Sequence, residues 1–245
     1  MDKVFYEVFE SLPRQGPGDD YSTKKAYMKL ALPKKPDILD IGCGSGKQTL
    51  ALAALSAGSI TAVDIHKPFL ESLRREYKKG KYPARVKIEE GDMSSLKYAD
   101  GSFDLIWSEG SCFIMGFQNA IASWRRLLRP GGYLVVSDLV WFRKNQPKEV
   151  RDYFAKICVV RYYRDLYAEI DSAGYDLVHY FKLPHDSWWT SYCVPMEKEV
   201  TELEHKYPAD AKERETLNAL QEEIEIHRRY HSYYGYGFYL MRKRD

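Results

Sequence analysis

Residues 37–47, Asp-Ile-Leu-Asp-Ile-Gly-Cys-Gly-Ser-Gly-Lys, constrain the fold of this chain more than any other stretch. Apolar residues run directly into glycines at positions 42, 44 and 46, and a helical pattern follows. Glycine lets a backbone pass close to a ligand where any Cβ would collide. The N–H groups and the dipole at the start of the helix favour an anionic group such as a carboxylate. The stretch therefore predicts a strand, a ligand-binding turn and a helix.

Two common nucleotide-binding motifs do not fit this turn. A Walker loop that ends at Gly46 and Lys47 would need glycine at position 41 and a hydroxyl residue at position 48, where Ile41 and Gln48 stand. A dinucleotide-binding GxGxxG/A motif that begins at Gly42 would need glycine or alanine at position 47, which is Lys47. NAD is therefore a weaker candidate ligand for this turn.

The region 36–143 alternates short apolar runs with amphipathic stretches, as βαβ units do. We expect an α/β fold: a Rossmann-like, seven-stranded, mostly parallel sheet flanked by helices, with a helical insertion before the last strand. The five strands of this core are predicted at residues 38–41, 60–64, 86–89, 103–107 and 133–137.

The pattern loosens after the core. A helix is predicted over residues 150–173, where apolar residues recur at helical spacing, and Gly174 fits its C-terminal stop. Residues 175–183 and 236–241 are predicted as the last two strands. We expect a single domain over residues 1–245, in which residues 1–35 form an N-terminal cap and residues 36–143 the cofactor-binding core.

The helical insertion is predicted over residues 185–232. Its second part, residues 211–230, carries apolar residues and a histidine on one side and charges on the other. The side predicted to be buried comprises Leu217, Leu220, Ile224 and His227. We interpret the insertion as a lid folded over the site, or alternatively as a dimer contact.

Composition and charge narrow the class of protein. Apolar residues make up 44% of the 245 residues and charged residues 29%, which is typical of a folded globular chain. The formal net charge is only +2, so no strong overall field favours nucleic acid or anionic lipid. No stretch reaches the ~18 to 20 apolar residues of a membrane span, and the amino terminus lacks the pattern of a signal peptide. We expect a cytoplasmic protein with no nucleic-acid or membrane partner.

The four cysteines, Cys43, Cys112, Cys158 and Cys193, are far apart in the sequence. The chain contains no CxxC pair, so neither a zinc site nor a disulfide framework is predicted. This spacing is typical of a reducing compartment. No metal site is expected.

The glycine turn and its companions resemble the motifs of class I S-adenosylmethionine-dependent methyltransferases of the small-molecule type. Residues 40–46, Asp-Ile-Gly-Cys-Gly-Ser-Gly, are similar to motif I of that family. Asp64 follows at the end of the second predicted strand, and Glu90-Gly-Asp-Met93 follows the third. Residues 103–110 resemble the fourth-strand motif, and residues 127–135, Leu-Leu-Arg-Pro-Gly-Gly-Tyr-Leu-Val, resemble the entry to strand five. The resemblance covers roughly residues 36–143.

The resemblance implies a set of cofactor-binding residues for S-adenosylmethionine. The glycines would pass beneath the methionine part, Asp64 would bind the ribose hydroxyls, and Ile65 or His66 would border the adenine. Asp92 with Met93 would recognise the adenine edge, and Ser108 and Glu109 would lie near the sulfonium and amino end. The predicted cofactor-binding residues are Gly42, Gly44, Gly46, Asp64, Ile65, Asp92, Met93 and Ser108.

Several of these residues also have plain structural interpretations. Asp64 and Asp92 could cap a helix or a turn, which aspartate does readily. Glu109 lies at the carboxyl edge of a parallel strand and so faces the ligand crevice, but it could simply pair with an arginine. His185 follows the sixth strand and has a suitable pKa for a base, although lone histidines are commonly structural. Glu109 and His185 are the candidate catalytic residues.

Aromatic residues are plentiful, and several follow strands that end at the crevice. Trp141, Trp188 and Tyr192 are the candidate substrate-binding residues. Their rings would suit a planar or cationic acceptor, since a desolvated cation over a ring gains up to ~2 kcal/mol. Core filling is the alternative role for the same side chains.

The predicted activity is in-line methyl transfer to a small-molecule acceptor. Positioning alone can supply ~7 to 11 kcal/mol of the barrier reduction, and a base is needed only if the acceptor must lose a proton. The alternatives are an RNA or protein methyltransferase, a NAD-binding oxidoreductase, or a non-catalytic cofactor-binding module. Strand four is followed by Ser108-Glu-Gly-Ser111 rather than Asn/Asp-Pro-Pro-Tyr, which disfavours methylation of a base amino group. A monomer or homodimer is expected.

Overall fold

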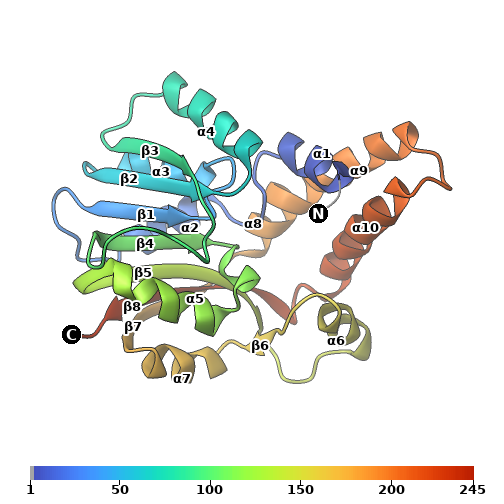
Figure 1. The fold of residues 1–245 in the computed structure, drawn as a ribbon. Coiled ribbons are helices and arrows are strands. Elements are labelled where there is room, and N and C mark those ends of the chain that lie inside the picture. Colours follow the sequence, from blue (N-terminus) through green and yellow to red (C-terminus); the bar gives the residue numbers. More distant parts are fainter. Residues whose placement is uncertain (1–2) are drawn as a thin grey trace.

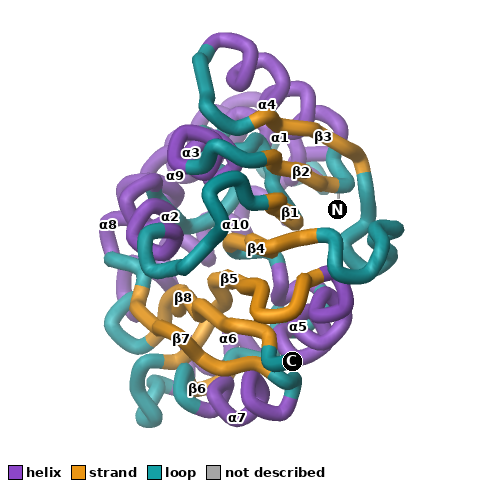
Figure 2. Tube along the Cα trace, turned by 90° about the vertical axis from the view of Figure 1, so that its left-hand side faces the viewer, coloured by secondary structure: helices purple, strands orange, loops and turns teal. Residues whose placement is uncertain are grey.

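A computed structural model describes residues 3–245. Its centre is one twisted sheet with helices packed on both sides (Figures 1 and 2). The strands are β1 (Asp37–Ile41), β2 (Ser59–Asp64), β3 (Arg85–Glu90), β4 (Phe103–Glu109), β5 (Leu128–Trp141), β6 (Arg161–Tyr162), β7 (Tyr175–Lys182) and β8 (Tyr234–Lys243).

The sheet has the order β3-β2-β1-β4-β5-β8-β7, and the short β6 pairs with β5 outside this path. Strands β1 to β5 are parallel to one another, and β8 runs antiparallel to both β5 and β7. The predicted Rossmann-like, mostly parallel sheet is confirmed, with seven strands on the main path. The carboxyl ends of β1 to β5 meet at one edge, where ligands bind in open α/β sheets.

The helices are α1 (Lys3–Ser11), α2 (Asp20–Tyr27), α3 (Lys47–Leu55), α4 (Lys67–Lys79), α5 (Phe117–Trp124), α6 (Lys148–Ala155), α7 (Asp165–Ser172), α8 (His185–Trp188), α9 (Val194–Lys206) and α10 (Glu213–Tyr230). Short 3-10 turns cover Cys112–Ile114 and Arg125–Leu127, and a π-helical segment, Trp189–Cys193, joins α8 to α9.

Alternation along the strands produces two buried layers. In β1, Ile38 packs in the core cluster that includes α3, whereas Leu39 and Ile41 pack in the cluster that includes α5 and α7. Successive strand residues point to opposite faces, so an uninterrupted apolar strand fills both layers. The near-continuous apolar runs of the sequence thus predict strands covered by helices on both faces.

Two predicted elements differ most from the structure. The strand predicted at residues 133–137 is longer at both ends, since β5 spans Leu128–Trp141. The single helix predicted over residues 150–173 is wrong, because α6 ends at Ala155 and α7 begins at Asp165. The apolar residues of the two helices belong to different layers: Phe154 packs in the first cluster and Leu166 in the second. One straight helix could not bury both.

The region predicted as an insertion folds into α8, the π-helical segment, α9 and α10. The α10 residues Leu217, Leu220, Ile224 and His227 are all buried, as the amphipathic pattern predicts. Helices α9 and α10 contact each other and α1, and these three helices stand beyond the carboxyl edge of the sheet (Figure 1). The N-terminal helix and the insertion therefore cover the same edge. Within residues 3–245, no helix is long and apolar enough to cross a bilayer.

Candidate active site

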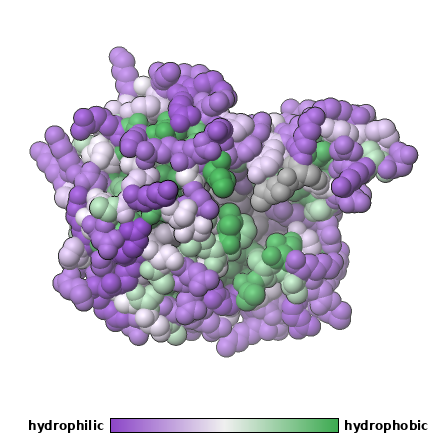
Figure 3. Space-filling view, viewed as in Figure 1, coloured by the Kyte–Doolittle hydropathy of each residue, from purple (hydrophilic) through white to green (hydrophobic). Residues whose placement is uncertain are grey.

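A cavity of about 520 Å³ lies between the carboxyl edge of the sheet and the helices that cover it. Figure 3 shows apolar residues, in green, gathered around a hollow in this position. One end, which we call the glycine-loop end, is lined by Gly42, Gly44, Asp64, Ile65, His66, Asp92, Met93 and Glu109. The other end, which we call the aromatic end, is lined by Tyr153, Phe154, Trp188, Tyr192, Glu223, Tyr234 and Tyr236.

The glycine-loop end requires glycine on steric grounds. Gly42 has φ +69° and Gly44 has φ +54°, in the region that favours glycine. A Cβ at position 42 would lie 2.4 Å from Ser111 Oγ, and one at position 44 would lie 2.8 Å from Gln15 Oε1. The loop backbone itself therefore forms part of the cavity wall.

Gly46 has a different role from the one the resemblance implies. It precedes α3 with φ +86°, and a Cβ there would lie 2.1 Å from Leu73 Cδ1 of α4. It is absent from the cavity lining. Glycine at this position allows α4 to pack closely against the loop, so the structure gives no support to direct ligand contact by Gly46.

Asp64 lies at the end of β2 with both carboxylate oxygens already accepting backbone hydrogen bonds. Oδ2 accepts from Gly44 N at 2.8 Å, and Oδ1 accepts from His66 N at 2.9 Å. An ionised carboxylate has about four lone-pair sites, so Asp64 can accept two further hydrogen bonds. Ile65, next in the chain, is 66% exposed and lines the cavity.

Asp92 and Met93 follow β3 at the same edge. Asp92 Oδ1 accepts from Ser94 N at 2.8 Å and from Ser94 Oγ at 2.7 Å, and these hydrogen bonds lower the pKa of Asp92. The Met93 carbonyl accepts from Trp124 Nε1 at 3.1 Å, which fixes this loop to α5. Asp92 thus caps its own turn and also lines the cavity.

Glu109 lies at the end of β4, and its carboxylate is both buried and fully engaged. It accepts from Thr23 Oγ1 at 2.7 Å, from Trp107 Nε1 at 2.8 Å and from Arg14 Nη1 at 3.2 Å. Burial raises the pKa of Glu109, and the Arg14 guanidinium opposes that effect. Glu109 therefore both borders the cavity and pairs with an arginine, the two positions predicted from the sequence as alternatives.

Ser108 does not line the cavity. It is fully buried, and its Oγ lies 2.7 Å from the Oγ of Ser111. Strand alternation directs neighbouring side chains to opposite faces of the sheet, so Ser108 and Glu109 cannot both face the same side. Ser111, which also donates to the Ile41 carbonyl at 3.1 Å, supplies the hydroxyl at the cavity.

His185 and Trp141 lie outside the cavity lining, contrary to prediction. His185 is exposed at the start of α8, with its ring 4.1 Å from that of His231. It follows β7, which the order β5-β8-β7 places at the far edge of the sheet. Trp141 packs against Phe154 and Tyr234, so these two rings separate it from the cavity.

Many lining residues were absent from the predicted site, among them Arg14, Gln15 and Glu223, which carry polar groups. Arg14 and Gln15 precede the core in the Arg-Gln-Gly-Pro-Gly segment, and Gln15 Oε1 accepts from Ser45 N at 2.8 Å. Glu223 lies on α10, three residues after Leu220 and four before His227, and therefore on its buried side. This helical spacing is the sequence signal that could have revealed Glu223, although the amphipathic pattern predicts charges on the opposite side of the helix.

The aromatic end is polar only at a few atoms. Trp188 and Tyr192 are buried and lie in its wall, as proposed for substrate contact. Burial raises the pKa of Glu223 to about 7, and a hydrogen bond from Tyr192 partly offsets this effect. In the described part of the chain, no cluster of His, Cys, Asp or Glu could hold a metal ion.

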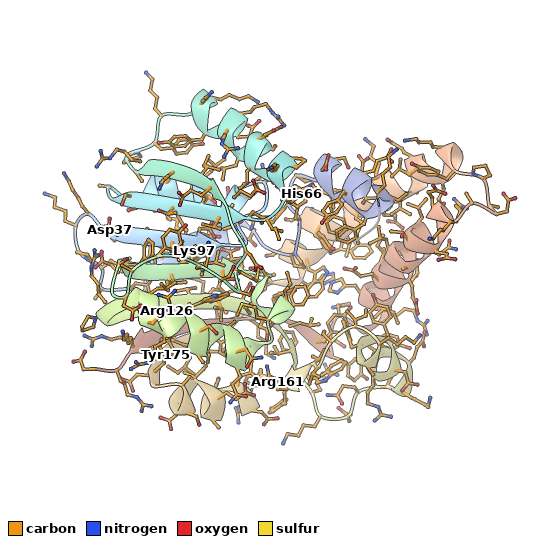
Figure 4. All side chains as sticks on the ribbon, viewed as in Figure 1. Asp37, His66, Lys97, Arg126, Arg161 and Tyr175 are labelled. Atoms are coloured by element: carbon orange, nitrogen blue, oxygen red, sulfur yellow. The ribbon has the colours of Figure 1, made fainter. Side chains whose placement is uncertain are left out.

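His66 and Asp37 mark the two edges of the sheet in Figure 4. His66 follows β2 at the cavity edge, where its ring stacks on Tyr6 of α1 at 4.0 Å and its Nε2 lies 2.8 Å from Glu10 Oε1. Asp37 begins β1 at the opposite edge and pairs with Arg129 at 2.9 Å. The His66 contacts thus join α1 to the carboxyl edge of the sheet, where the cavity lies.

Residues 39–136 match a family described as a methyltransferase domain. The chain is 32% identical over 122 residues to an O-methyltransferase, cnsE, of Penicillium expansum, a match that covers 49% of this chain and 44% of that protein. It is 33% identical over 104 residues to a 27-O-demethylrifamycin SV methyltransferase of Amycolatopsis mediterranei, covering 42% and 38%. The chain thus spans less than half the length of these relatives.

Solved structures match over the whole chain. A methyltransferase from Geobacter sulfurreducens in complex with S-adenosyl-L-homocysteine has a TM-score of 0.85 at 21% identity and covers 100% of this chain and 99% of its own. The cyclase SpnF has a TM-score of 0.77 at 19% identity, with 98% and 91% covered. At these identities the likeness establishes the fold.

Proposed function

We propose that this chain, which belongs to the class I S-adenosylmethionine-dependent methyltransferases, transfers a methyl group from S-adenosylmethionine to a small-molecule acceptor. The observation that carries the proposal is the single cavity that joins the glycine-loop end to the aromatic end. One end has the backbone and carboxylate groups for a nucleoside, and the other has an apolar wall for a second molecule. A volume of about 520 Å³ lies within the range of small-molecule sites.

The residues at the glycine-loop end fit the cofactor. Asp64 would accept the two ribose hydroxyls with its remaining lone pairs, and Ile65 would pack against the adenine. Asp92 and Met93 would contact the adenine edge, while the close backbone at Gly42 and Gly44 would border the methionine part. S-adenosylmethionine, when bound, supplies a methyl group activated by its sulfonium.

The protein's contribution is positioning and exclusion of water. Hydrogen bonds at the sheet edge hold Gly42, Asp64 and Met93 in place. The glycine-loop end of the cavity is therefore organised before ligands bind. Preorganised groups avoid the entropic cost of ordering at the moment of reaction. Glu109 positions the N-terminal segment rather than taking a proton, because three donors already occupy its carboxylate.

The α9–α10 pair serves as a lid over the acceptor. Support comes from Glu223 of α10, which lines the cavity, and from the contacts of α9 and α10 with α1. A lid of this kind excludes water and completes the acceptor site. The proposal fails if a folded variant that lacks residues 196–231 shows unchanged acceptor binding and turnover.

Calorimetry tests the cofactor assignment. We expect binding of S-adenosylmethionine and S-adenosylhomocysteine and no binding of NADH. Asp64→Asn should weaken S-adenosylhomocysteine about tenfold or more, because hydrogen bonds to a charged group are lost. Asp100→Asn, at an exposed carboxylate before β4, is the control and should bind normally. Absence of binding to either nucleoside would refute the assignment.

Turnover must be measured separately, because a cyclase shares this fold. Release of S-adenosylhomocysteine should be followed with panels of small amines, phenols, carboxylates and thiols. Turnover with any of these would support methyl transfer to a small molecule. Cofactor binding without turnover on any acceptor would favour a binding module, and salt-dependent retention of RNA would favour an RNA substrate.

A further inference from the structure

We propose that the aromatic end of the cavity recognises a positively charged group of the acceptor, with Glu223 as its counter-ion and the surrounding rings as its cage. This inference rests on the proposed function, since it specifies the second substrate of the same site. It concerns how the acceptor is held and leaves open which of its atoms receives the methyl group.

The first observation is a carboxylate without a cationic partner. Glu223 lines the cavity, and no Lys or Arg within residues 3–245 forms an ion pair with it. The neighbouring arginines of α10 are committed elsewhere: Arg228 pairs with Glu197 and Glu225, and Arg229 pairs with Glu149. Glu223 is partly buried, and a carboxylate withdrawn from water without a cationic partner is costly. A cationic ligand would supply the missing charge.

The second observation is a continuous wall of rings beside that carboxylate. The centroids of Tyr153 and Phe154 lie 5.0 Å apart, and those of Phe154 and Tyr234 lie 4.6 Å apart. Trp188 continues the wall, 5.5 Å from Tyr234 and 5.0 Å from Tyr236. The hydroxyl of Tyr192 bonds to Glu223 and so fixes the carboxylate beside the rings.

Within residues 3–245, no Lys or Arg lies over the rings of this wall, and the His227 ring covers one face of Trp188 at 4.4 Å. Burial lowers the pKa of His227 to about 3, so this ring adds no positive charge at neutral pH. Lysine and arginine side chains in the described chain lie over other rings, such as Arg228 over Trp189 and Arg143 over Tyr233. The quadrupole of an aromatic face attracts cations, most strongly where water is excluded. Rings that surround one unpaired carboxylate therefore match an alkylammonium group better than a neutral or anionic one.

Glu109 cannot serve the same purpose. It is the other glutamate in the lining, but its carboxylate already pairs with Arg14 and accepts two further hydrogen bonds. The two glutamates of the lining thus have different roles: Glu109 stabilises the fold, and Glu223 is available to a ligand.

The test uses a matched pair of probes, choline and its neutral isostere 3,3-dimethylbutan-1-ol, which differ in a nitrogen cation against a carbon. Each is titrated calorimetrically into protein saturated with S-adenosylhomocysteine. We expect choline to bind about tenfold or more tightly than the isostere, from the combined ion pair and ring contacts. Equal affinity for the two probes overturns the proposal.

Glu223→Gln removes the charge with little change in shape and should reduce the preference to less than about threefold. Glu222→Gln is the matched control, because Glu222 is the exposed neighbour on the same helix and should keep the full preference. Affinity for S-adenosylhomocysteine and the unfolding temperature should match the wild type in both variants. If Glu223→Gln does not fold, Glu223→Met provides a second neutral side chain of similar length.

The outcomes separate this proposal from the one on which it rests. A cation preference that survives in the Glu223 variants overturns the role of Glu223. Loss of turnover in Glu223→Gln without any wild-type cation preference overturns the cation site and indicates a base for a neutral acceptor. The same titrations without S-adenosylhomocysteine complete the test: if the protein binds choline selectively but never binds S-adenosylhomocysteine, the proposed function fails and the cation site stands.

Discussion

The Arg14 guanidinium lies 3.2 Å from the Glu109 carboxylate, with the two side chains only 9% and 3% exposed. The pair joins the segment before the core to the end of β4, and Glu109 also accepts from Thr23 of α2. The N-terminal cap is therefore fastened at the carboxyl edge of the sheet through one buried carboxylate. Removing Arg14 leaves the buried Glu109 carboxylate without its counter-charge, whereas Arg14 also lies 3.3 Å from the exposed Asp20 carboxylate.

Arg14→Met should lower the free energy of unfolding by about 3 kcal/mol or more, because breaking a buried ion pair from one side is strongly destabilising. Urea unfolding measures the loss. Arg14→Met combined with Glu109→Gln removes both charges and should be less destabilising than the sum of the two single changes. Additive losses would show that the pair is not coupled and that the cap is held by its other contacts.

Gly42 provides a second test, because its steric demand can be separated from its backbone conformation. Gly42→Ala adds a Cβ that would lie 2.4 Å from Ser111 Oγ, at φ +69°. Gly101→Ala is the control: its φ is +65°, but nothing lies within 4 Å of the added Cβ. Both variants should share a backbone cost of about 1 to 2 kcal/mol. Only Gly42→Ala should weaken S-adenosylhomocysteine binding, measured by calorimetry, and equal binding by the two would contradict the close approach.

The glycine-loop end of the cavity could be predicted from the sequence because its position depends on the local order of strands and loops along the chain. A parallel strand that ends at Ile41 or Asp64 must present the following residues at the carboxyl edge of the sheet, whatever the rest of the chain does. The same reasoning does not predict on which face of the sheet a given side chain lies. The fourth-strand motif predicts that Ser108 and Ser111 both lie near the carboxyl end of β4. Which of the two hydroxyls reaches the cavity depends on the packing of the strand.

The aromatic end of the cavity depends on contacts between segments distant in the sequence, which a single sequence does not reveal. Glu223 reaches the cavity because α10 packs beside α1, a pairing set by tertiary contacts. His185 follows a strand whose carboxyl end points to the correct edge, yet the position of β7 outside β8 removes it from the cavity. The direction of a strand could be predicted, whereas its place in the sheet could not.

His185→Ala should leave turnover unchanged, because the side chain is exposed and lies outside the cavity lining. The measurement is the initial rate of S-adenosylhomocysteine release, over pH 6 to 9, with any acceptor found by screening. A general base typically contributes about 10² to 10⁴-fold to the rate. A loss of that size, together with a shifted pH profile, would restore His185 as a catalytic residue.

Asp40 makes the pH dependence of stability a further test. Its carboxylate is fully buried in β1, where it accepts from Thr49 Oγ1 at 2.5 Å, and burial raises its pKa from 3.8 to about 7. The folded protein therefore keeps a proton that the unfolded chain releases. Stability from this group is complete below pH 4 and is lost as the pH rises towards 7.

Asp40→Asn should remove that dependence. Between pH 4 and 7 the wild-type free energy of unfolding should fall more steeply than that of the variant, by a few kcal/mol in total, since each pKa unit corresponds to about 1.4 kcal/mol. Asp37→Asn is the control of opposite sign. Hydrogen bonds from Ser59 and Arg129 lower the pKa of Asp37, so its stabilisation is present above its usual pKa and is lost as the pH falls. Urea unfolding between pH 4 and 7 measures Asp40→Asn, and the same measurement below pH 4 measures Asp37→Asn. Parallel curves for the wild type and Asp40→Asn between pH 4 and 7 would contradict a protonated Asp40 beneath the glycine loop.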